Sequence, residues 1–579
     1  MGLKPRLFRL TRSPFDGRKG AFALLTVILV YQVIIPFMMI IWTSFKTARP
    51  GEPDFLLLNF TLANYVRAYA NKDFWDATWN TVCFGVAATI LALLPGTFLA
   101  WVVARTNTPL ARLIGMLTLG RIIIPGILIT VSWILIASPS IGILNYFIEA
   151  LFGVKRLLNI YSFWGMVWVH SLEMAPLAYL LVSAALQGMD PRLEEASNVA
   201  GAGRCSTFTR ISLPLILPAT SAAVLLLFIQ TVETFEVPLL LGGRAGVRLY
   251  TTEVFFNTAR TPTDWGLASA YSMALLVLSL VLLFAYFRLV RHSERYQTIT
   301  GKDYRPRRID LGRSRYITCA ASFFLVFLIT GLPFLIMLYA SFLPNFQPPT
   351  LAVLEKMTFA NYRGIFGEDT QAIAPMWNST LLGLGTATAV MLLVSAIGYF
   401  VHKTRMSGRQ VLDFLGFAPI ALPSVVLGTA FLWFYLLVPL PVLGTLAIIG
   451  LAYLTRYMAV ALRFVSTSML QIHGELEEAA IVAGGNWWNN FSRIFLPLLR
   501  PGLMAGWFWV MVHAFRELTI ALMLARANNR TAAVVIFDLW DNGSFQELSA
   551  FGVLMFGLLI ALVSVAHKFG KQHGIEGQI

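Results

Sequence analysis

A polar stretch that occurs twice constrains the fold of this chain more than any other feature of its sequence. The first copy begins with EEASNVAG at Glu194 and ends with ISLP at Pro214; the second begins with EEAAIVAG at Glu477 and ends with IFLP at Pro497. A Glu-Ala start, a helix-breaking Gly and a Leu-Pro pair predict a helix, a turn and a second helix. Long apolar runs flank both copies, so we expect each copy to lie on the surface of a membrane.

The apolar runs themselves predict an all-α integral membrane protein. Of the 579 residues, 57% are hydrophobic and only 13% are charged, and the mean hydropathy is +0.70. About twelve runs come near or exceed the roughly 18–20 residues that a spanning helix needs. The predicted spans cover residues 21–43, 77–104, 113–137, 161–187, 214–241 and 267–290 in the first half, and residues 317–342, 377–402, 411–437, 445–466, 502–525 and 550–567 in the second.

Matching landmarks indicate that the chain is a duplication of one six-span unit. The triplet ANY at Ala63 recurs at Ala360, WNT at Trp79 recurs as WNS at Trp377, and Pro125 has a counterpart in Pro423. An even number of spans keeps both halves in the same orientation, which predicts a parallel pseudo-two-fold repeat with both polar stretches on one face. The first half carries about 15 extra residues, which we expect in an external loop between Pro139 and Tyr161.

The distribution of basic residues predicts which segments face the cytoplasm. The net charge is +15, and Lys and Arg cluster in residues 1–20 and in the connector 291–316. The positive-inside rule assigns both segments, and with them the C-terminal residues 568–579, to the cytoplasm. The two membrane halves are then residues 21–290 and 317–567, with their polar loops at about 190–214 and 473–497. This charge pattern favours membrane lipids as a partner, and the absence of aromatic-basic groove patterns argues against nucleic acid.

The duplicated stretch resembles the EAA loop of binding-protein-dependent ABC importer permeases. The family pattern is Glu-Ala-Ala, three residues, Gly, nine residues, Ile, one residue and Leu-Pro; the second copy matches throughout and the first departs only at Ser197. Two loops in one chain resemble the fused double permeases of the ferric-iron type. The resemblance implies a type I fold, a bacterial inner membrane, and loops that dock into cytoplasmic ATPase subunits. The coupling residues that it implies are Glu195, Ala196, Gly201, Leu213 and Pro214 in the first loop, and Glu478, Ala479, Gly484, Leu496 and Pro497 in the second. The alternative for each glutamate is that it only caps or solvates an interfacial helix.

The chain carries no motif for ATP hydrolysis. A phosphate-binding loop needs Gly-x-x-x-x-Gly-Lys-Ser/Thr, and neither Gly301-Lys302 nor Gly570-Lys571 has the earlier Gly at that spacing. We therefore predict no catalytic residue and no cofactor. By resemblance, the partners are two separate ATP-binding subunits on the cytoplasmic face and an extracytoplasmic solute-binding protein. Three cysteines without a CxxC spacing support neither a disulfide framework nor a zinc site.

Charged residues within predicted spans are costly, which makes them candidates for the transport pathway. At the repeat offset, Glu173 aligns with Arg456, and Glu233 aligns with Arg516. Equivalent positions of a two-fold pore face its axis together, so an acid and a base can lie across the pathway. The candidates for the pathway or its gate are Glu173, Glu233, Glu236, Arg456, Arg516 and Glu517. A structural ion pair that packs the halves together is an alternative of equal weight.

Two histidines within the spans are interpreted as interior side chains and not as metal ligands. His170 precedes Glu173 by three residues, which is half of a bundle metal site at best, and Tyr453 stands at the equivalent position of the second half. We expect His170 and His513 to be hydrogen-bonded in the interior, and we predict no metal ligand in the chain.

The resemblance leaves the transported solute open. Iron(III) is the first expectation, but phosphonate, thiamine, polyamine and anion importers share the motif. A different class, an ion-coupled secondary transporter, would work without an ATPase and would show broken helices at the midplane. A channel would need a ring of repeated polar groups, whereas the two halves here carry unlike charges. The matched polar loops favour the ATP-driven importer.

Overall fold

The computed structural model describes residues 17–188, 196–197, 199–293, 308–367, 372–438, 440–472, 493 and 496–571. Within these residues, nine helices are long and apolar enough to cross a membrane, and two helix pairs form bent spans, which gives up to eleven. The predicted all-α integral membrane fold is confirmed. Of the twelve predicted spans, residues 502–525 do not form one apolar span, because the helix there ends at Arg516 and a short separate helix follows.

The first half consists of long helices that are joined by short helical segments. Its helices are α1 (Gly17–Leu29), α2 (Ile35–Ser44), α3 (Ala63–Tyr69), α4 (Lys72–Arg105), α5 (Ala111–Gly120), α6 (Gly126–Ala137), α7 (Ile143–Phe152), α8 (Phe163–Gln187), α10 (Arg204–Thr207), α11 (Leu213–Val232), α13 (Tyr250–Ala259) and α14 (Trp265–Ser293). A π-helical turn at Val30–Ile34 joins α1 to α2 in one span.

The second half repeats this order. Its helices are α15 (Ser314–Val326), α16 (Leu332–Ser341), α17 (Leu351–Leu354), α18 (Ala360–Ile365), α19 (Ile373–Lys403), α20 (Arg409–Phe417), α21 (Ser424–Leu437), α22 (Leu446–Leu470), α25 (Leu496–Arg516), α26 (Thr519–Leu524), α27 (Ala532–Asp541) and α28 (Phe545–Lys571). A π-helical turn again interrupts the first span, at Phe327–Gly331. The core of each half is a packed group of three helices: α4, α8 and α11 in the first, and α19, α22 and α25 in the second.

The two halves make the same hydrogen bonds at their matching landmarks. Asn64 donates to the carbonyl oxygens of Ser44 and Lys46 at 3.1 and 2.7 Å, and Asn361 donates to those of Ser341 and Leu343 at 2.9 and 2.8 Å. In both cases the side chain ties a short surface helix to the end of the first span. This shared contact supports the duplication that the sequence predicts.

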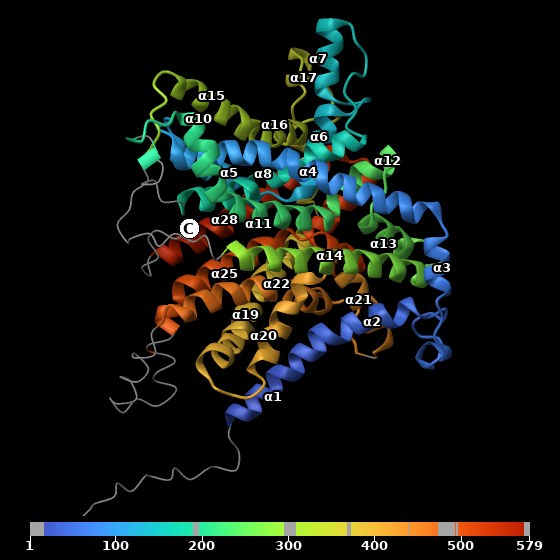
Figure 1. Cartoon of the computed structure of the whole chain (residues 1–579). Helices are drawn as coiled ribbons and strands as arrows, with labels where there is room; N and C mark the ends of the chain where they lie inside the picture. The colour runs from blue at the N-terminus through green and yellow to red at the C-terminus, as the bar shows by residue number, and fades with distance from the viewer. Residues whose placement is uncertain are drawn as a thin grey trace, which may run out of the picture.

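The helices of the two halves run in the same sense. In Figure 1, α1 and α15 begin on the left of the view, on the same side as α10, and the long helices α4, α8 and α14 cross it from side to side. Polar caps start equivalent spans: Ser162 accepts from the amide of Gly165 at the start of α8, and Thr445 accepts from the amide of Ala447 at the start of α22. This arrangement is the parallel repeat that the even number of spans predicts.

Two predicted spans are sharply bent, which the apolar runs did not indicate. The segment predicted at 113–137 is α5 and a 3₁₀ turn (Arg121–Ile123) followed by α6, with a bend of 101°; the segment predicted at 411–437 is α20 and a 3₁₀ turn (Ala418–Ala421) followed by α21, with a bend of 109°. The cause is a proline directly before α6 and α21, at Pro125 and Pro423. A residue before proline avoids the helical conformation, and Ile124 is extended, with ψ of 128°.

A third correction concerns the ends of two other spans. In the segment predicted at 214–241, α11 ends at Val232, residues 233–235 are not helical, and a π-helical turn follows at Pro238–Gly242. The segment predicted at 502–525 has its break after Arg516. Both breaks occur at equivalent positions of the repeat and fall on the charged residues that were predicted to lie within continuous helices.

Candidate functional site

The bends after α5 and α20 leave backbone carbonyl groups without helical partners, and arginines bind them. Arg516 donates to the carbonyl oxygens of Ile122 and Ile124 at 2.6 and 3.1 Å, so the end of α25 in the second half is bonded to the bend of the first half. Arg121 donates to the Ile124 carbonyl from within the same bend, at 2.7 Å. A buried carbonyl without a partner costs free energy, so these guanidinium groups stabilise the broken spans.

The equivalent bend of the second half is held by Arg456 and by a glutamate from the first half. Arg456, on α22, donates to the Leu422 carbonyl at 2.8 Å and makes an ion pair with Glu233, whose Oε2 lies 3.2 Å from Nη2. The Glu233 side chain is only 5% exposed and that of Arg456 is 18% exposed. The two halves therefore meet through a charged pair that is largely withdrawn from water.

The sequence predicted opposite charges at equivalent positions, and the structure changes which residues meet. Aligned partners are not bonded to each other: Glu233 pairs with Arg456, whereas its aligned residue Arg516 binds carbonyl groups of the first half. Glu233, just after the fifth span of the first half, binds the arginine at the bend of the second half, and Arg516, at the end of the fifth span of the second half, binds the bend of the first. Alignment of the repeat identifies which residues occupy equivalent positions in the two halves. It does not identify which residues touch, because here the contacting residues, Glu233 and Arg456, occupy positions that are not equivalent.

Two further carboxylates converge on the start of α6. A side chain at Gly126 would collide with Oε1 of Glu173 and with Oε2 of Glu236, so both carboxylates lie directly against this glycine. Glu173 also lies 3.7 Å from Arg121 and 3.5 Å from Nδ1 of His170. The absence of a side chain at position 126 is therefore what lets two acidic groups approach the same helix start, where the helix dipole favours negative charge.

Glu517 has a structural partner of its own. Its carboxylate accepts hydrogen bonds from the backbone amides of Ile520 and Ala521 at the start of α26, with Oε2 at 3.0 and 3.4 Å. This contact satisfies amide groups that have no partner within the helix. Glu517 thus fixes the break after α25 and at the same time faces the cavity described next.

All six pathway candidates line one cavity of about 1460 Å³. Its wall comes from α8, α11, α14, α22, α25 and the two bends, so both halves contribute to it. The charged residues on the wall are Arg121, Glu173, Glu233, Glu236, Arg288, Arg456, Arg463, Arg516 and Glu517. From the level of these bends the wall continues along α8 to Leu180 and along α22 to Arg463, in the direction of the polar loops that follow both helices.

Sequence reasoning missed Arg121 and Arg463 as members of this wall. Arg121 is 2% exposed, and its Nε and Nη2 atoms make no hydrogen bond in the described residues. Arg121 lies within the predicted span 113–137 and Arg463 within the predicted span 445–466, so the cost of a charge in a span could have found both. Arg463 lies over the ring of Phe417 at 4.4 Å.

The two histidines lie inside the molecule, as predicted, with different partners. Nδ1 of His513 is hydrogen-bonded to the Trp509 carbonyl at 2.8 Å, and its ring stacks on the Trp509 indole with the centroids 4.0 Å apart. His170 is 1% exposed, but neither ring nitrogen makes a hydrogen bond in the described residues, which corrects that part of the prediction. The part of the chain that the structure describes brings together no group of three or more His, Cys, Asp and Glu that could hold a metal ion.

The predicted coupling loops are described only in part. Glu195, Glu478, Ala479 and Gly484 lie outside the described residues. Gly201 has φ of +80°, a conformation that glycine adopts without strain. Leu213-Pro214 and Leu496-Pro497 are the first residues of α11 and α25, as predicted. Ala196 is exposed.

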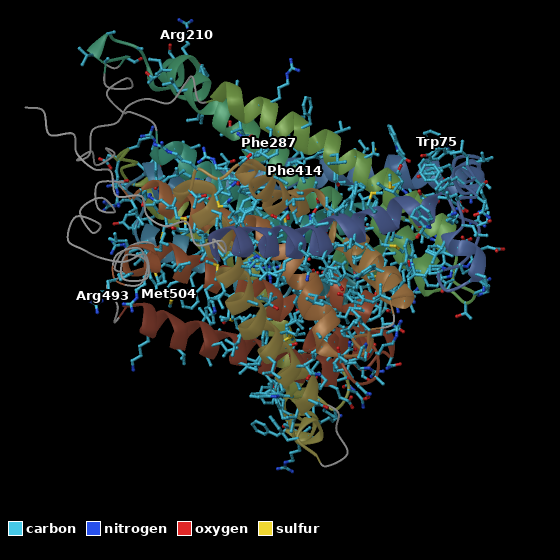
Figure 2. The ribbon with its side chains drawn as sticks, turned by 90° about the horizontal axis from the view of Figure 1, so that it is seen from below. Trp75, Arg210, Phe287, Phe414, Arg493 and Met504 are labelled. Atoms are coloured by element: carbon cyan, nitrogen blue, oxygen red, sulfur yellow. The ribbon has the colours of Figure 1, made fainter. Side chains whose placement is uncertain are left out.

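The two loop regions lie at the same end of the molecule. Figure 2 labels Arg210 and Arg493, which are equivalent residues of the two repeats, and both lie on the left of the view, opposite Trp75 on the right. This placement of Arg210 and Arg493 at one end of the molecule agrees with the parallel repeat.

Comparison with known proteins gives the family of this chain. Residues 96–295 match the family described as "Binding-protein-dependent transport system inner membrane component". The spermidine/putrescine transport system permease protein PotB of Haemophilus influenzae is 30% identical over 280 residues, which are 45% of this chain and 89% of that protein. The chain belongs to this family of transport permeases. It is a multi-pass membrane component of an ABC importer, and permeases of this kind work with ATPase subunits and a solute-binding protein.

Longer matches link the permease to ferric transport proteins. It is similar to the ferric transport system permease protein FbpB of Actinobacillus pleuropneumoniae, with 26% identity over 550 residues, or 94% of this chain and 77% of that protein. A putative ferric transport permease of Haemophilus influenzae is 26% identical over 88% of this chain and 78% of its own length. A solved bacterial ABC transporter for alginate import is 19% identical with a TM-score of 0.40, and covers 49% of this chain and 97% of the matched chain.

Proposed function

We propose that this permease forms the membrane pathway of an ATP-driven iron(III) importer and that the cavity between its halves is the inward-facing part of that pathway. The cavity is the observation on which the proposal depends: both halves line it, it contains all six predicted pathway residues, and it extends toward the loops. In an alternating-access cycle, closure of this cavity has to move the bend of one half relative to the residues of the other half that bind it. The contacts that this movement would have to break or rearrange are the Glu233–Arg456 ion pair and the hydrogen bonds from Arg516 to carbonyl groups of the first half.

The identity of the solute follows from the extent of the matches. The ferric transport permeases match 94% and 88% of this chain and therefore both halves, whereas the polyamine permease matches 45% of it. Iron(III) is thus favoured over phosphonate, thiamine, polyamine or an anion.

Two separate ATP-binding subunits drive the cycle through the two polar loops. In this proposal, residues 190–214 and 473–497 are the docking loops, Glu195 and Glu478 meet basic groups of the ATPases, and Gly201 and Gly484 make the turns. Leu213-Pro214 and Leu496-Pro497 transmit the motion, since they begin α11 and α25, whose far ends carry Glu233 and Arg516. Both termini and the connector 291–316 are cytoplasmic. An extracytoplasmic binding protein delivers the solute to the outer face of the two membrane halves, residues 21–290 and 317–567.

Broken helices, which were expected of an ion-coupled secondary transporter, do not distinguish the two classes here. The permease has two bent spans, yet its family is that of binding-protein-dependent transport. The bends fit the cavity model, because their freed carbonyl groups face a polar space and not lipid.

The test is transport by the purified permease in proteoliposomes with its ATPase subunits and binding protein. We expect uptake of radioactive iron(III) that requires ATP and all components. Glu195→Ala with Glu478→Ala should abolish co-purification of the ATPase, whereas Arg463→Gln, which changes the cavity only, should retain it. Uptake by the permease alone would refute the ATP-driven class, and ATP-dependent uptake of another solute would refute iron(III) only.

A further inference from the structure

The short helix α7 is a feature of the first half that the transport pathway does not use. It lies in the segment between the end of α6 at Ala137 and the start of α8 at Phe163. The matching connection in the second half, residues 438–445, contains no helix among its described residues. The predicted extra residues of the first half therefore build this helix.

The base of α7 is fixed to the body of the protein. Asn145 is buried, and its amide group donates to the carbonyl oxygens of Ser138 and Leu158 at 3.0 and 2.8 Å, while its oxygen accepts from the Leu158 amide at 2.8 Å. Gly153 ends the helix with φ of +69° and donates to the Glu149 carbonyl. These contacts define the direction in which α7 leaves the span ends.

One face of α7 is apolar and uncovered. Residues 143, 146, 147, 150, 151 and 154 follow the spacing of one helix face and are all apolar. Three large ones among them project from the protein: Tyr146 is 44% exposed, Phe147 39% and Leu151 75%. Phe152, at the end of α7 and on the opposite side of the helix, is 74% exposed. An uncovered apolar face of this kind needs an apolar environment or a partner.

The position of α7 identifies that environment. It connects two spans at their outer ends, at the opposite end from the polar loops, and Trp164 in the first turn of α8 is 69% exposed, as is typical of a residue at the membrane interface. In Figure 1, α7 stands upright, across the direction of α4, α8 and α14, and projects from the body of the protein. A helix that runs across the spanning direction at the level of their ends lies along the plane of the membrane surface.

The charges beside the apolar face fit a lipid surface. Lys155 and Arg156 lie three and four residues after the end of α7. Lys155 lies 3.5 Å from Glu149, and its side chain remains 78% exposed. Basic residues at the polar edge of an amphipathic helix can bind headgroup phosphates. A soluble partner that dissociated in each cycle would instead leave the aromatic face in water between encounters.

We propose that α7 is an interfacial helix that lies on the outer leaflet with Tyr146, Phe147 and Leu151 in the boundary between headgroups and acyl chains. It fastens the first half to the lipid surface next to α8, which carries Glu173 of the cavity wall. The matching connection of the second half has no helix among its described residues, so this contact has no counterpart at the equivalent position.

The test is the membrane depth of single nitroxide labels in the full permease. In a background in which Cys83, Cys205 and Cys319 are replaced by Ser, labels are attached after Leu151→Cys, Glu149→Cys or Lys72→Cys, and single permeases are placed in lipid nanodiscs. Accessibility to oxygen and to a water-soluble nickel chelate is then measured. We expect the ratio of chelate to oxygen accessibility at position 151 to be roughly tenfold lower than at position 72, with position 149 between them.

Each other outcome overturns the proposal. Equal chelate accessibility at positions 151 and 72 would show that α7 stands in water. Protection of position 151 only after addition of the extracytoplasmic binding protein would identify a protein-docking helix. Protection of position 151 only in nanodiscs that hold two copies of the permease would identify a contact between copies. Equal protection at positions 149 and 151 would show that α7 is inserted in the lipid or packed in protein, and does not lie at the interface.

Discussion

The ion pair between Glu233 and Arg456 allows a direct test of the contact between the two halves. The perturbations are Glu233→Gln, Arg456→Gln and the exchanged pair Glu233→Arg with Arg456→Glu. The exchange keeps one acid and one base at the junction, whereas each single change leaves the remaining charge without its partner. Arg456 would retain only its bond to the Leu422 carbonyl.

The size of the effect can be worked from the geometry. At 3.2 Å and an effective dielectric constant of about 20, the attraction is about 5 kcal/mol. Desolvation offsets much of this, and loss of one partner from a fully buried pair costs about 3–5 kcal/mol. Because Arg456 is 18% exposed and both residues face the cavity, we take about 2 kcal/mol for the single variants, below the fully buried range.

A free-energy change of this size has a measurable consequence for transport. A shift of about 2 kcal/mol changes a conformational equilibrium by roughly 30-fold, and transport that must pass through this inward-facing state falls by up to that factor. The assay is the initial rate of ATP-dependent uptake in proteoliposomes, with the amount of folded permease measured by size-exclusion chromatography. Arg463→Gln is the matched control, because Arg463 lines the same cavity but contacts Phe417.

The exchanged pair decides whether the two residues act together. If the pair is the relevant contact, the exchanged variant recovers a large part of the rate, and the double variant Glu233→Gln with Arg456→Gln loses about 1–3 kcal/mol less than the two single variants together in a double-mutant cycle. If the exchanged variant recovers nothing and the two Gln effects simply add, Glu233 and Arg456 act independently and the proposed junction is wrong. Normal transport in both single variants would refute the pathway and the structural interpretation together.

Three glycine and asparagine variants test other parts of the structure. Gly126→Ala should lower uptake at least tenfold, because its Cβ would collide with two carboxylates of the cavity. Gly120→Ala, whose Cβ would meet open space, should not lower uptake. Equal uptake rates in the two variants would refute the close approach of Glu173 and Glu236 to Gly126. Gly201→Ala should weaken ATPase coupling by about 1 kcal/mol, because a side chain strains the backbone at φ of +80°. Gly203→Ala, at a position without such a φ, is its control. Coupling is measured as the stimulation of ATP hydrolysis by the permease. Asn64→Ala should lower thermal stability by about 1–3 kcal/mol through two lost hydrogen bonds, and an unchanged melting temperature would contradict this.

Much of the architecture follows from the sequence because membrane helices leave a strong signal. The apolar runs predicted the long helices α4, α8, α14, α19 and α22 to within a few residues, since no other element satisfies its backbone groups in lipid. The repeat offset predicted the parallel halves, and Leu213-Pro214 and Leu496-Pro497 predicted where α11 and α25 begin. These features are local or periodic, so they can be identified directly in a sequence.

The bends were not predicted because the hydropathy of a segment does not show whether its helix axis changes direction. Pro125 and Pro423 were recognised as equivalent landmarks, but an apolar run of the same length can be one straight span or two helices at 101°. Once the bend exists, its free carbonyl groups explain why Arg516 and Arg456 are there. The six pathway candidates were found because a charge in a span is costly, and Arg121, within the predicted span 113–137, carries the same signal although it was not among them.

The divergence of the two halves at these positions has a consequence for the substrate. At the first bend, Gly126 lets Glu173 and Glu236 approach the start of α6 beside Arg121. At the equivalent bend the residues are Ser424, Arg456 and Thr519, and the available carboxylate comes from Glu233 of the other half. A pore made of two identical halves would present the same charges twice and would have to keep like charges apart around its axis. The fused chain can instead place two carboxylates and the guanidinium groups of Arg121 and Arg516 at one bend and a single acid–base pair at the other, so a substrate that enters the cavity meets unlike surroundings on its two sides.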